Sequence, residues 1–127
     1  MTKRILIVDD VLGWIRFHKN NLEYLNLDLD IDAAYSAKEA LAKIECSIDN
    51  PYSVILTDLQ MESDFLPKLA GEWFVEQVKM FKEYQNANIV IISASPDISI
   101  IANRLGVKYF SKTDARNCQA HEYERFL

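Results

Sequence analysis

Short, wholly apolar runs alternate with amphipathic segments along the length of this 127-residue chain. Three runs rich in β-branched residues cover positions 5–8, 54–56 and 89–92. Such a run is typical of a strand that is buried on both faces of a parallel sheet. Over positions 27–33 apolar residues alternate with aspartates, which predicts an edge strand with one wet face. A fifth strand is expected at 107–110.

Between these expected strands, apolar residues recur at helical spacing, which predicts helices there. Ser36 and Glu39 form a capping-box pattern at the start of one helix, and Gly106 is a helix stop after another. The expected helices cover 11–25, a stretch that begins at 37, about 70–84, 98–105 and, weakly, the region from 114 onward. In the helix at 70–84, Trp73 is expected on the apolar face.

The resulting order, βαβαβαβαβα with short connections, predicts an α/β fold. Right-handed crossovers between parallel strands would place helices on both faces of the sheet. The chain is also of a length that fits one domain comfortably and two poorly. We therefore predict a single doubly wound domain over residues 1–127.

Charge and cysteine usage exclude several classes of protein. The net charge is −5 and no Lys/Arg run exceeds two residues, which argues against direct nucleic-acid binding. Cys46 and Cys118 lie far apart and outside any CxxC pattern, so we expect free thiols in a reducing compartment. The first apolar run is too short for a signal-peptide core, and nothing approaches membrane-spanning length. We expect a cytoplasmic protein.

Polar side chains follow four of the five expected strands. Asp9 and Asp10 come after the first strand, Asp58 after the third, Ser93 after the fourth and Lys112 after the fifth. Parallel strands bring their carboxyl ends to one edge of the sheet, where ligands bind. Three carboxylates packed together repel one another unless a cation intervenes, and hard oxygen ligands suit Mg²⁺. With an ammonium and a hydroxyl available for phosphoryl oxygens, the pattern predicts a phosphoryl-transfer site with a carboxylate nucleophile.

Four segments of the chain resemble the receiver domains of bacterial two-component response regulators, the CheY-like superfamily. They are residues 5–10 (ILIVDD), 54–61 (VILTDLQM), 91–94 (IISA) and 108–112 (KYFSK). The segments occur in the family's order and cover the chain nearly end to end. The resemblance implies a flavodoxin-like (βα)5 fold with the strand order 2-1-3-4-5.

The resemblance also implies a phosphorelay function with assigned residues. Asp58 would accept a phosphoryl group from a histidine kinase or a phosphotransfer protein. Asp9 and Asp10 would hold Mg²⁺ together with Asp58 and the backbone carbonyl of Gln60. Lys112 would pair with Asp58, and with the phosphoryl oxygen once Asp58 is modified. Such a domain is a signalling module and not a conventional enzyme, although it catalyses its own phosphotransfer and slow autodephosphorylation.

The switch implied by the resemblance is a population shift. Ser93 would move toward the phosphoryl group and Tyr109 would turn inward behind it. The surface of the fourth helix, fifth strand and fifth helix would then change and control a partner or a fused output domain. Gln60 and Ser95 lie near the expected approach of an attacking water, so they are candidates for tuning dephosphorylation.

The sequence departs from the usual family pattern in two segments. The loop over 62–71 is long, has Glu62 where family members often have proline, and could be an adapted partner surface or a tolerated insertion. Thr113 follows Lys112, where the family usually has a proline that helps to fix the lysine. His18 and His121 are expected to be surface residues.

Three other functions place different demands on the same residues. A phosphatase of the haloacid-dehalogenase type would need a second aspartate two residues beyond the nucleophile, where this chain has Gln60. A dinucleotide-binding domain would need GxGxxG directly after the first strand, and Gly13 is the one glycine in that part of the chain. An interaction module with a receiver fold that works without phosphorylation stays open as the alternative.

Overall fold

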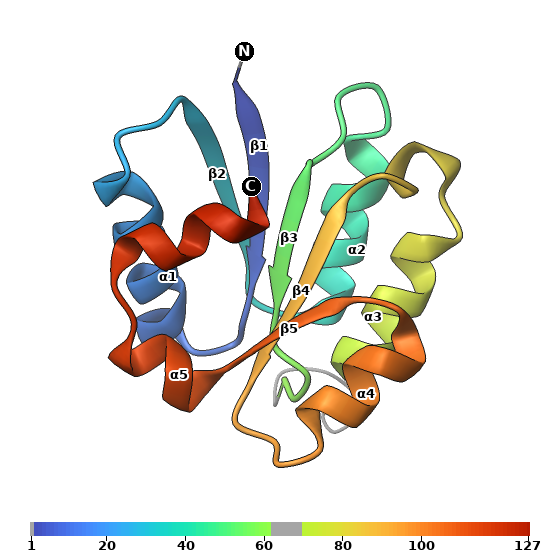
Figure 1. Ribbon diagram of the computed structural model, residues 1–127. Coiled ribbons are helices and arrows are strands. Elements are labelled where there is room, and N and C mark those ends of the chain that lie inside the picture. Colours follow the sequence, from blue (N-terminus) through green and yellow to red (C-terminus); the bar gives the residue numbers. More distant parts are fainter. Residues whose placement is uncertain (1, 62–69) are drawn as a thin grey trace.

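The computed structural model describes residues 2–61 and 70–127. Within them, five parallel strands form one sheet in the order β2-β1-β3-β4-β5 (Figure 1). The strands are β1 (Lys3–Val8), β2 (Leu29–Ala34), β3 (Val54–Thr57), β4 (Asn88–Ser93) and β5 (Lys108–Ser111). The predicted fold class, the strand order and the edge position of β2 are therefore confirmed.

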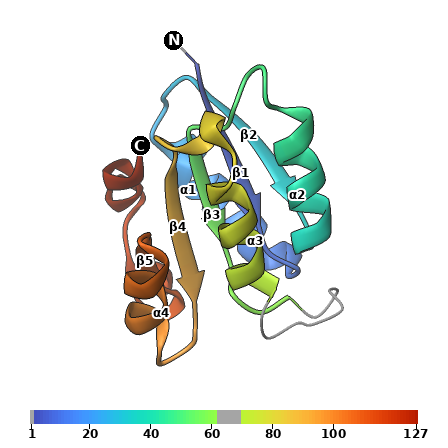
Figure 2. The same cartoon turned by 90° about the vertical axis from the view of Figure 1, so that its right-hand side faces the viewer.

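Helices cover both faces of the sheet. They are α1 (Leu12–Tyr24), α2 (Ala37–Cys46), α3 (Ala70–Lys79), α4 (Ile98–Leu105) and α5 (Lys112–Asn117), with the 3₁₀ segments η2 (Lys82–Tyr84) and η3 (Ala120–Phe126). Figures 1 and 2 show α1, α5 and η3 on one face and α2, α3 and α4 on the other. This two-sided covering explains why the central strands are continuously apolar.

Alternate residues of each central strand enter the two halves of the core. Ile5 and Ile7 of β1 pack with the residues under α1 and η3, whereas Leu6 and Val8 pack with those under α2 and α3. All four side chains are buried. Because side chains of a strand alternate between faces, a parallel strand between two helical layers must be apolar at every position.

Two helix boundaries confirm the signals that predicted them. The Ser36 hydroxyl accepts a hydrogen bond from the Glu39 amide at 3.0 Å, and the Glu39 carboxylate accepts one from the Tyr35 amide at 2.8 Å. The predicted Ser36 cap of α2 is confirmed, and the predicted return bond to Glu39 comes from the Tyr35 amide, one residue before the cap. Gly106, with φ of 70°, ends α4 in the left-handed conformation that glycine adopts without strain.

Several local predictions were wrong. The helix expected over 70–84 ends at Lys79, because Phe81 is extended (φ −89°, ψ 122°) before η2 begins. Trp73 does not face the core, since it is 43% exposed. The stretch from 114 onward is helical, as expected, although extended backbone at Cys118 and Gln119 divides it into α5 and η3.

The histidine prediction was half wrong. His18 is buried, and its Nδ1 lies 2.7 Å from the Tyr123 hydroxyl, so α1 and η3 are joined by a buried hydrogen bond. His121 is exposed, as expected. Burial, and after it the nearby charge of Lys112, lowers the pKa of His18 from 6.5 to about 4.

Three further expectations concern surfaces and segments. Cys46 and Cys118 are free thiols. Among residues 2–61 and 70–127, no helix has the length and apolar character needed to cross a membrane. Most of the loop at 62–71 lies outside the described residues, so its role stays a prediction.

Candidate functional site

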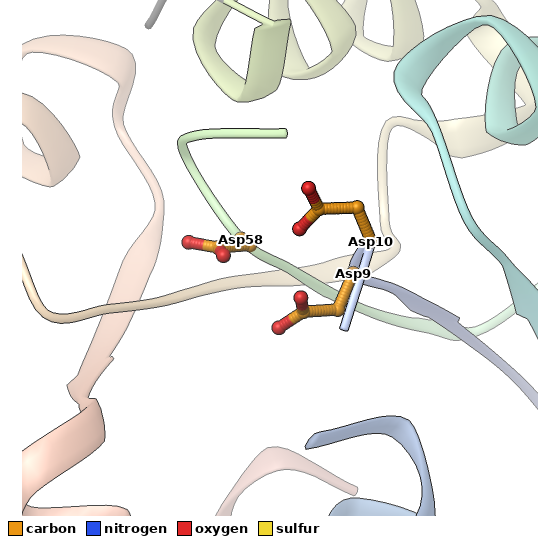
Figure 3. Close-up of side chains that lie close together, drawn as sticks. All are labelled: Asp9, Asp10 and Asp58. Atoms are coloured by element: carbon orange, nitrogen blue, oxygen red, sulfur yellow. The ribbon is translucent and has the colours of Figure 1, made fainter. Parts of the chain in front are cut away.

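Three aspartates meet at the carboxyl edge of the sheet. Asp9 and Asp10 follow β1, and Asp58 follows β3 (Figure 3). The register pairs Val8 with Thr57, and the Asp58 amide donates to the Val8 carbonyl at 2.9 Å, so the ends of the two strands are level. One carboxylate oxygen from each aspartate lies within 4.8 Å of the others. The sequence prediction that these side chains come together is confirmed.

Lys112 supplies the positive charge beside these carboxylates. Its Nζ lies 2.8 Å from Asp58 Oδ2 and 3.2 Å from Asp9 Oδ2, and its side chain is 11% exposed. Burial opposes the charged ammonium, but the hydrogen bond to Asp58 and the two carboxylate charges outweigh it and raise the pKa of Lys112. The ammonium is therefore held in its charged form between two acids.

Local hydrogen bonds fix Lys112 and Asp58 from the backbone side. Lys112 is the first residue of α5, and the capping Ser111 hydroxyl accepts from the Asp114 amide at 3.1 Å. Asp58 Oδ1 accepts from the Leu59 amide at 2.7 Å, while its Oδ2 faces Lys112. Each oxygen of the Asp58 carboxylate thus has a defined partner.

Asp9 has a strongly raised pKa. Burial, and after it the charge of Asp58, raises its pKa from 3.8 to about 6. The Val11 amide, which donates to Asp9 Oδ1 at 2.9 Å, and the Lys112 ammonium oppose this rise. Burial and the neighbouring charge of Asp58 both disfavour the ionised Asp9 carboxylate, and a cation at the site would offset both effects.

Gly71 is a positioning residue that the sequence predictions missed. A Cβ at this position would lie 2.2 Å from the Asp58 carbonyl oxygen and 2.5 Å from Leu59 Cα, so only glycine fits. The Gly71 amide also donates to the Leu59 carbonyl at 2.9 Å. The first turn of α3 is thereby packed against the backbone of the candidate acceptor. A glycine placed at the start of the expected helix, in a chain with only three, was the available signal.

Among the described residues, the remaining predicted site residues make no hydrogen bond or ion pair with Asp58. Ser93 is the last residue of β4, is buried, and its hydroxyl accepts from the Ser95 amide at 3.1 Å. Ser95 in turn accepts from the Asp97 amide at 3.2 Å. Tyr109 of β5 is 46% exposed and Gln60 is also exposed.

The donor chemistry of the site fits a small divalent cation. Three carboxylates carry three formal negative charges against one ammonium, and all their ligand atoms are hard oxygens. The same edge holds a lysine suited to a phosphoryl oxygen and a carboxylate suited to nucleophilic attack. The arrangement can therefore hold a metal and accept a phosphoryl group at one place.

Comparison with known proteins agrees with this geometry. The response regulator ArlR of Staphylococcus saprophyticus is 37% identical over 97 residues, which cover 76% of this chain and 38% of the relative. The match thus covers well under half the length of this curated relative. No family model matches the chain.

Solved structures share the whole fold. Chemotaxis response regulator CheY4 of Vibrio cholerae matches with a TM-score of 0.77 at 21% identity, covering 100% of both chains. The phosphorylated cyanobacterial phytochrome response regulator RcpA matches with a TM-score of 0.77 at 21% identity, covering 97% of this chain and 93% of RcpA. The Mn²⁺-bound response regulator Rcp1 matches with a TM-score of 0.77 at 20% identity, covering 98% of this chain and 94% of Rcp1. The chain is a receiver domain of the kind found in two-component response regulators.

Proposed function

We propose that this receiver domain takes a phosphoryl group onto Asp58 in a Mg²⁺-dependent step. The observation that carries the proposal is the meeting of three carboxylates with one buried ammonium at the carboxyl edge of the sheet. The donor would be a phosphohistidine of a kinase or of a phosphotransfer protein. One structural relative, RcpA, has been solved as a phosphorylated regulator, which supports this chemistry for the fold.

Asp58 would act as the nucleophile in this reaction. One of its carboxylate oxygens attacks phosphorus, and an O–P bond forms as the P–N bond to the donor imidazole breaks. The electron pair of that bond stays on the imidazole nitrogen, which takes up a proton. Lys112, already 2.8 Å from Asp58 Oδ2, would turn its ammonium to the phosphoryl oxygen as the carboxylate oxygen becomes esterified.

The metal ligands would be the carboxylates of Asp9, Asp10 and Asp58 and the backbone carbonyl of Gln60. Bound Mg²⁺ would offset the negative charge shared by these acids and the incoming phosphoryl oxygens. The Mn²⁺-bound form of Rcp1 supports a divalent cation in this fold. Hydrolysis would be slow, with Gln60 and Ser95 as the side chains that tune it.

Phosphorylation would change the surface formed by α4, β5 and α5. Ser93 ends β4 and Tyr109 lies on the neighbouring β5, where Ile91 pairs with Tyr109 and Ser93 with Ser111. Phosphorylation would draw the Ser93 hydroxyl to the phosphoryl group and favour an inward Tyr109, which is 46% exposed in this structure. The population of one surface conformation would rise, and a partner would bind it.

The output partner could be a separate protein or a further domain of the same polypeptide. The match to ArlR leaves most of that regulator outside the aligned region, and NtrX from Brucella abortus matches over 98% of this chain but 26% of its own. Both support a role as the receiver part of a larger regulator. We place this signalling in the cytoplasm, without direct contact to nucleic acid or membrane.

Mass spectrometry after incubation with acetyl phosphate tests the proposal. Wild type and the control Asp49→Asn, a change at an exposed loop residue, should each gain one phosphoryl group only when Mg²⁺ is present. Asp58→Asn should gain none. If wild type gains nothing, beryllofluoride binding separates rapid hydrolysis from a site that takes no phosphoryl group. Failure of both would favour an interaction module that works without phosphorylation.

A further inference from the structure

The Lys112 ammonium has a third neighbour besides the two carboxylates. Its Nζ lies 5.0 Å from the centroid of the Trp14 ring, over the face of the indole. Arg116, one helical turn further along α5, also places its guanidinium over this ring, at 5.9 Å. Trp14 therefore contacts α5 through two cations that lie one helical turn apart. An ammonium over an indole face is attracted by the negative potential of the ring.

Trp14 is itself held by its own helix and by the buried layer behind it. The Trp14 amide donates to the Val11 carbonyl at 3.1 Å in the first turn of α1. Its ring meets Phe17 edge-on at 5.5 Å and lies 5.5 Å from His18, tilted by 30°. His18 is tied to the Tyr123 hydroxyl of η3 at 2.7 Å. The indole is therefore a fixed surface and not a free side chain.

The fixed Trp14 ring can restrain the flexible side chain of Lys112. A lysine has a long flexible stem, so its ammonium must be restrained to stay in one place. The two carboxylates that restrain it are the same groups that a divalent cation and a phosphoryl group would use. The indole offers no oxygen to the metal, so its hold on the ammonium persists when the carboxylates change partners.

We infer that Trp14 is a positioning residue for Lys112 in the phosphoryl-transfer step. The inference rests on the proposed function, and it adds a group that acts on the reaction through Lys112 and offers no oxygen ligand to the metal. Its role is to keep the ammonium within reach of the phosphoryl oxygen while Asp58 changes from carboxylate to acyl phosphate.

Two substitutions at Trp14 separate the ring face from bulk packing. Trp14→Leu keeps an apolar side chain and removes the aromatic face, whereas Trp14→Phe keeps a smaller face. With acetyl phosphate and Mg²⁺, the phosphorylation rate of Trp14→Leu should fall about tenfold, equivalent to about 1.4 kcal/mol. Trp14→Phe should recover most of the rate. The exposed Trp73 provides the matched control, since Trp73→Leu should leave the rate unchanged.

A double-mutant cycle tells positioning from a general structural defect. In a Lys112→Met background the ammonium is absent, so Trp14→Leu should cause no further loss of rate. An equal loss in both backgrounds, or an unchanged rate in the Trp14→Leu single variant, would overturn the inference. Thermal unfolding of each variant shows that the proteins compared are folded.

A second measurement tests the contact when phosphorylation is not seen at all. In wild type the Hε protons of Lys112 should be shifted upfield by the ring current of the Trp14 indole. The shift should vanish in Trp14→Leu and be partly kept in Trp14→Phe. Unshifted Hε protons in wild type would refute the Trp14 assignment. A wild type with shifted Hε protons that takes up no phosphoryl group would instead refute the proposed function alone.

Discussion

The Lys112 ammonium lies 2.8 Å from Asp58 Oδ2 and joins the end of β3 to the first residue of α5. The same ammonium lies 3.2 Å from Asp9 Oδ2, so it also reaches the end of β1. The Asp58, Asp9 and Lys112 side chains are 8%, 3% and 11% exposed. A single buried charge thus holds two acids of the candidate phosphoryl site together, and any change in one of the three groups affects the others.

Removing this charge should destabilise the metal-free protein. Lys112→Met leaves two buried carboxylates without their cation, which should cost about 3 kcal/mol in the free energy of unfolding at pH 7.5. The loss should be smaller near pH 5, because Asp9, with its pKa raised to about 6, takes up a proton there. Urea unfolding at both pH values measures the effect.

The surface pair of Lys43 and Asp32 is the control for this change. It has a similar distance, 2.9 Å, but the two side chains are 33% and 39% exposed. Lys43→Met should therefore cost less than about 1 kcal/mol. Equal losses for the buried and the exposed lysine would contradict the account of the site as a buried charge cluster.

Gly71 should tolerate no side chain. In Gly71→Ala the new Cβ would meet the Asp58 carbonyl and the Leu59 backbone, so the start of α3 or the acceptor loop must shift. We expect a loss of at least about 2 kcal/mol in stability and a slower phosphorylation of Asp58.

Gly13 in α1 is the matched control for the glycine prediction. A Cβ there meets nothing within 4 Å. Gly13→Ala should therefore stabilise the protein by about 0.5–1 kcal/mol, because glycine is unfavourable inside a helix. A Gly71→Ala protein as stable as wild type would show that α3 does not press on the acceptor backbone.

His18 should make the protein less stable as the pH falls. Its pKa is about 4 in the folded protein and about 6.5 when unfolded, so protons bind preferentially to the unfolded chain. The stabilisation is complete above pH 6.5 and is lost as the pH falls toward 4. Between pH 7 and pH 5 this residue alone should remove about 2 kcal/mol.

The His18 contribution is isolated by comparison with His18→Gln. Asp9 acts in the opposite direction in the metal-free protein, since its raised pKa favours the folded state as the pH falls through about 6. The difference in pH dependence between wild type and His18→Gln cancels that contribution. Parallel stability curves for the two proteins would mean that His18 is not buried in its neutral form.

Ser93 should be needed for the switch more than for phosphorylation itself. Its hydroxyl accepts from the Ser95 amide in this structure, and we expect its O–H to donate to a phosphoryl oxygen once Asp58 is phosphorylated. In Ser93→Ala, beryllofluoride should still bind, but the NMR shift changes on α4 and β5 should be largely lost. Ser93→Thr, which keeps the hydroxyl, should retain them. Unchanged shift differences in Ser93→Ala would exclude Ser93 as the switch.

The site residues that follow the strands were predictable, because parallel strands all end at the same edge of the sheet. Apolar runs located β1, β3 and β4, and the polar residue after each run had to fall on the common carboxyl edge. Thus the meeting of Asp9, Asp10 and Asp58 followed from spacing alone. The contact of Lys112 followed in the same way, from its place after β5.

The predictions that failed concern packing between helices and strands, which the periodicity of apolar residues does not describe. His18 belongs to α1, yet its burial is decided by Tyr123, which is far away in the sequence. The clash at Gly71 depends on how closely α3 approaches the Asp58 backbone. The end of α3 was missed because Phe81 continues the apolar spacing although its backbone has already left the helix.

Locating the phosphoryl group within the chain tests the central claim most directly. Borohydride reduces an aspartyl phosphate to homoserine, so peptide mapping after exposure to acetyl phosphate and Mg²⁺ identifies the acceptor. We predict homoserine at position 58 alone, and none when Mg²⁺ is withheld. Homoserine at another aspartate, or a phosphoryl group resistant to borohydride, would contradict the assignment of Asp58.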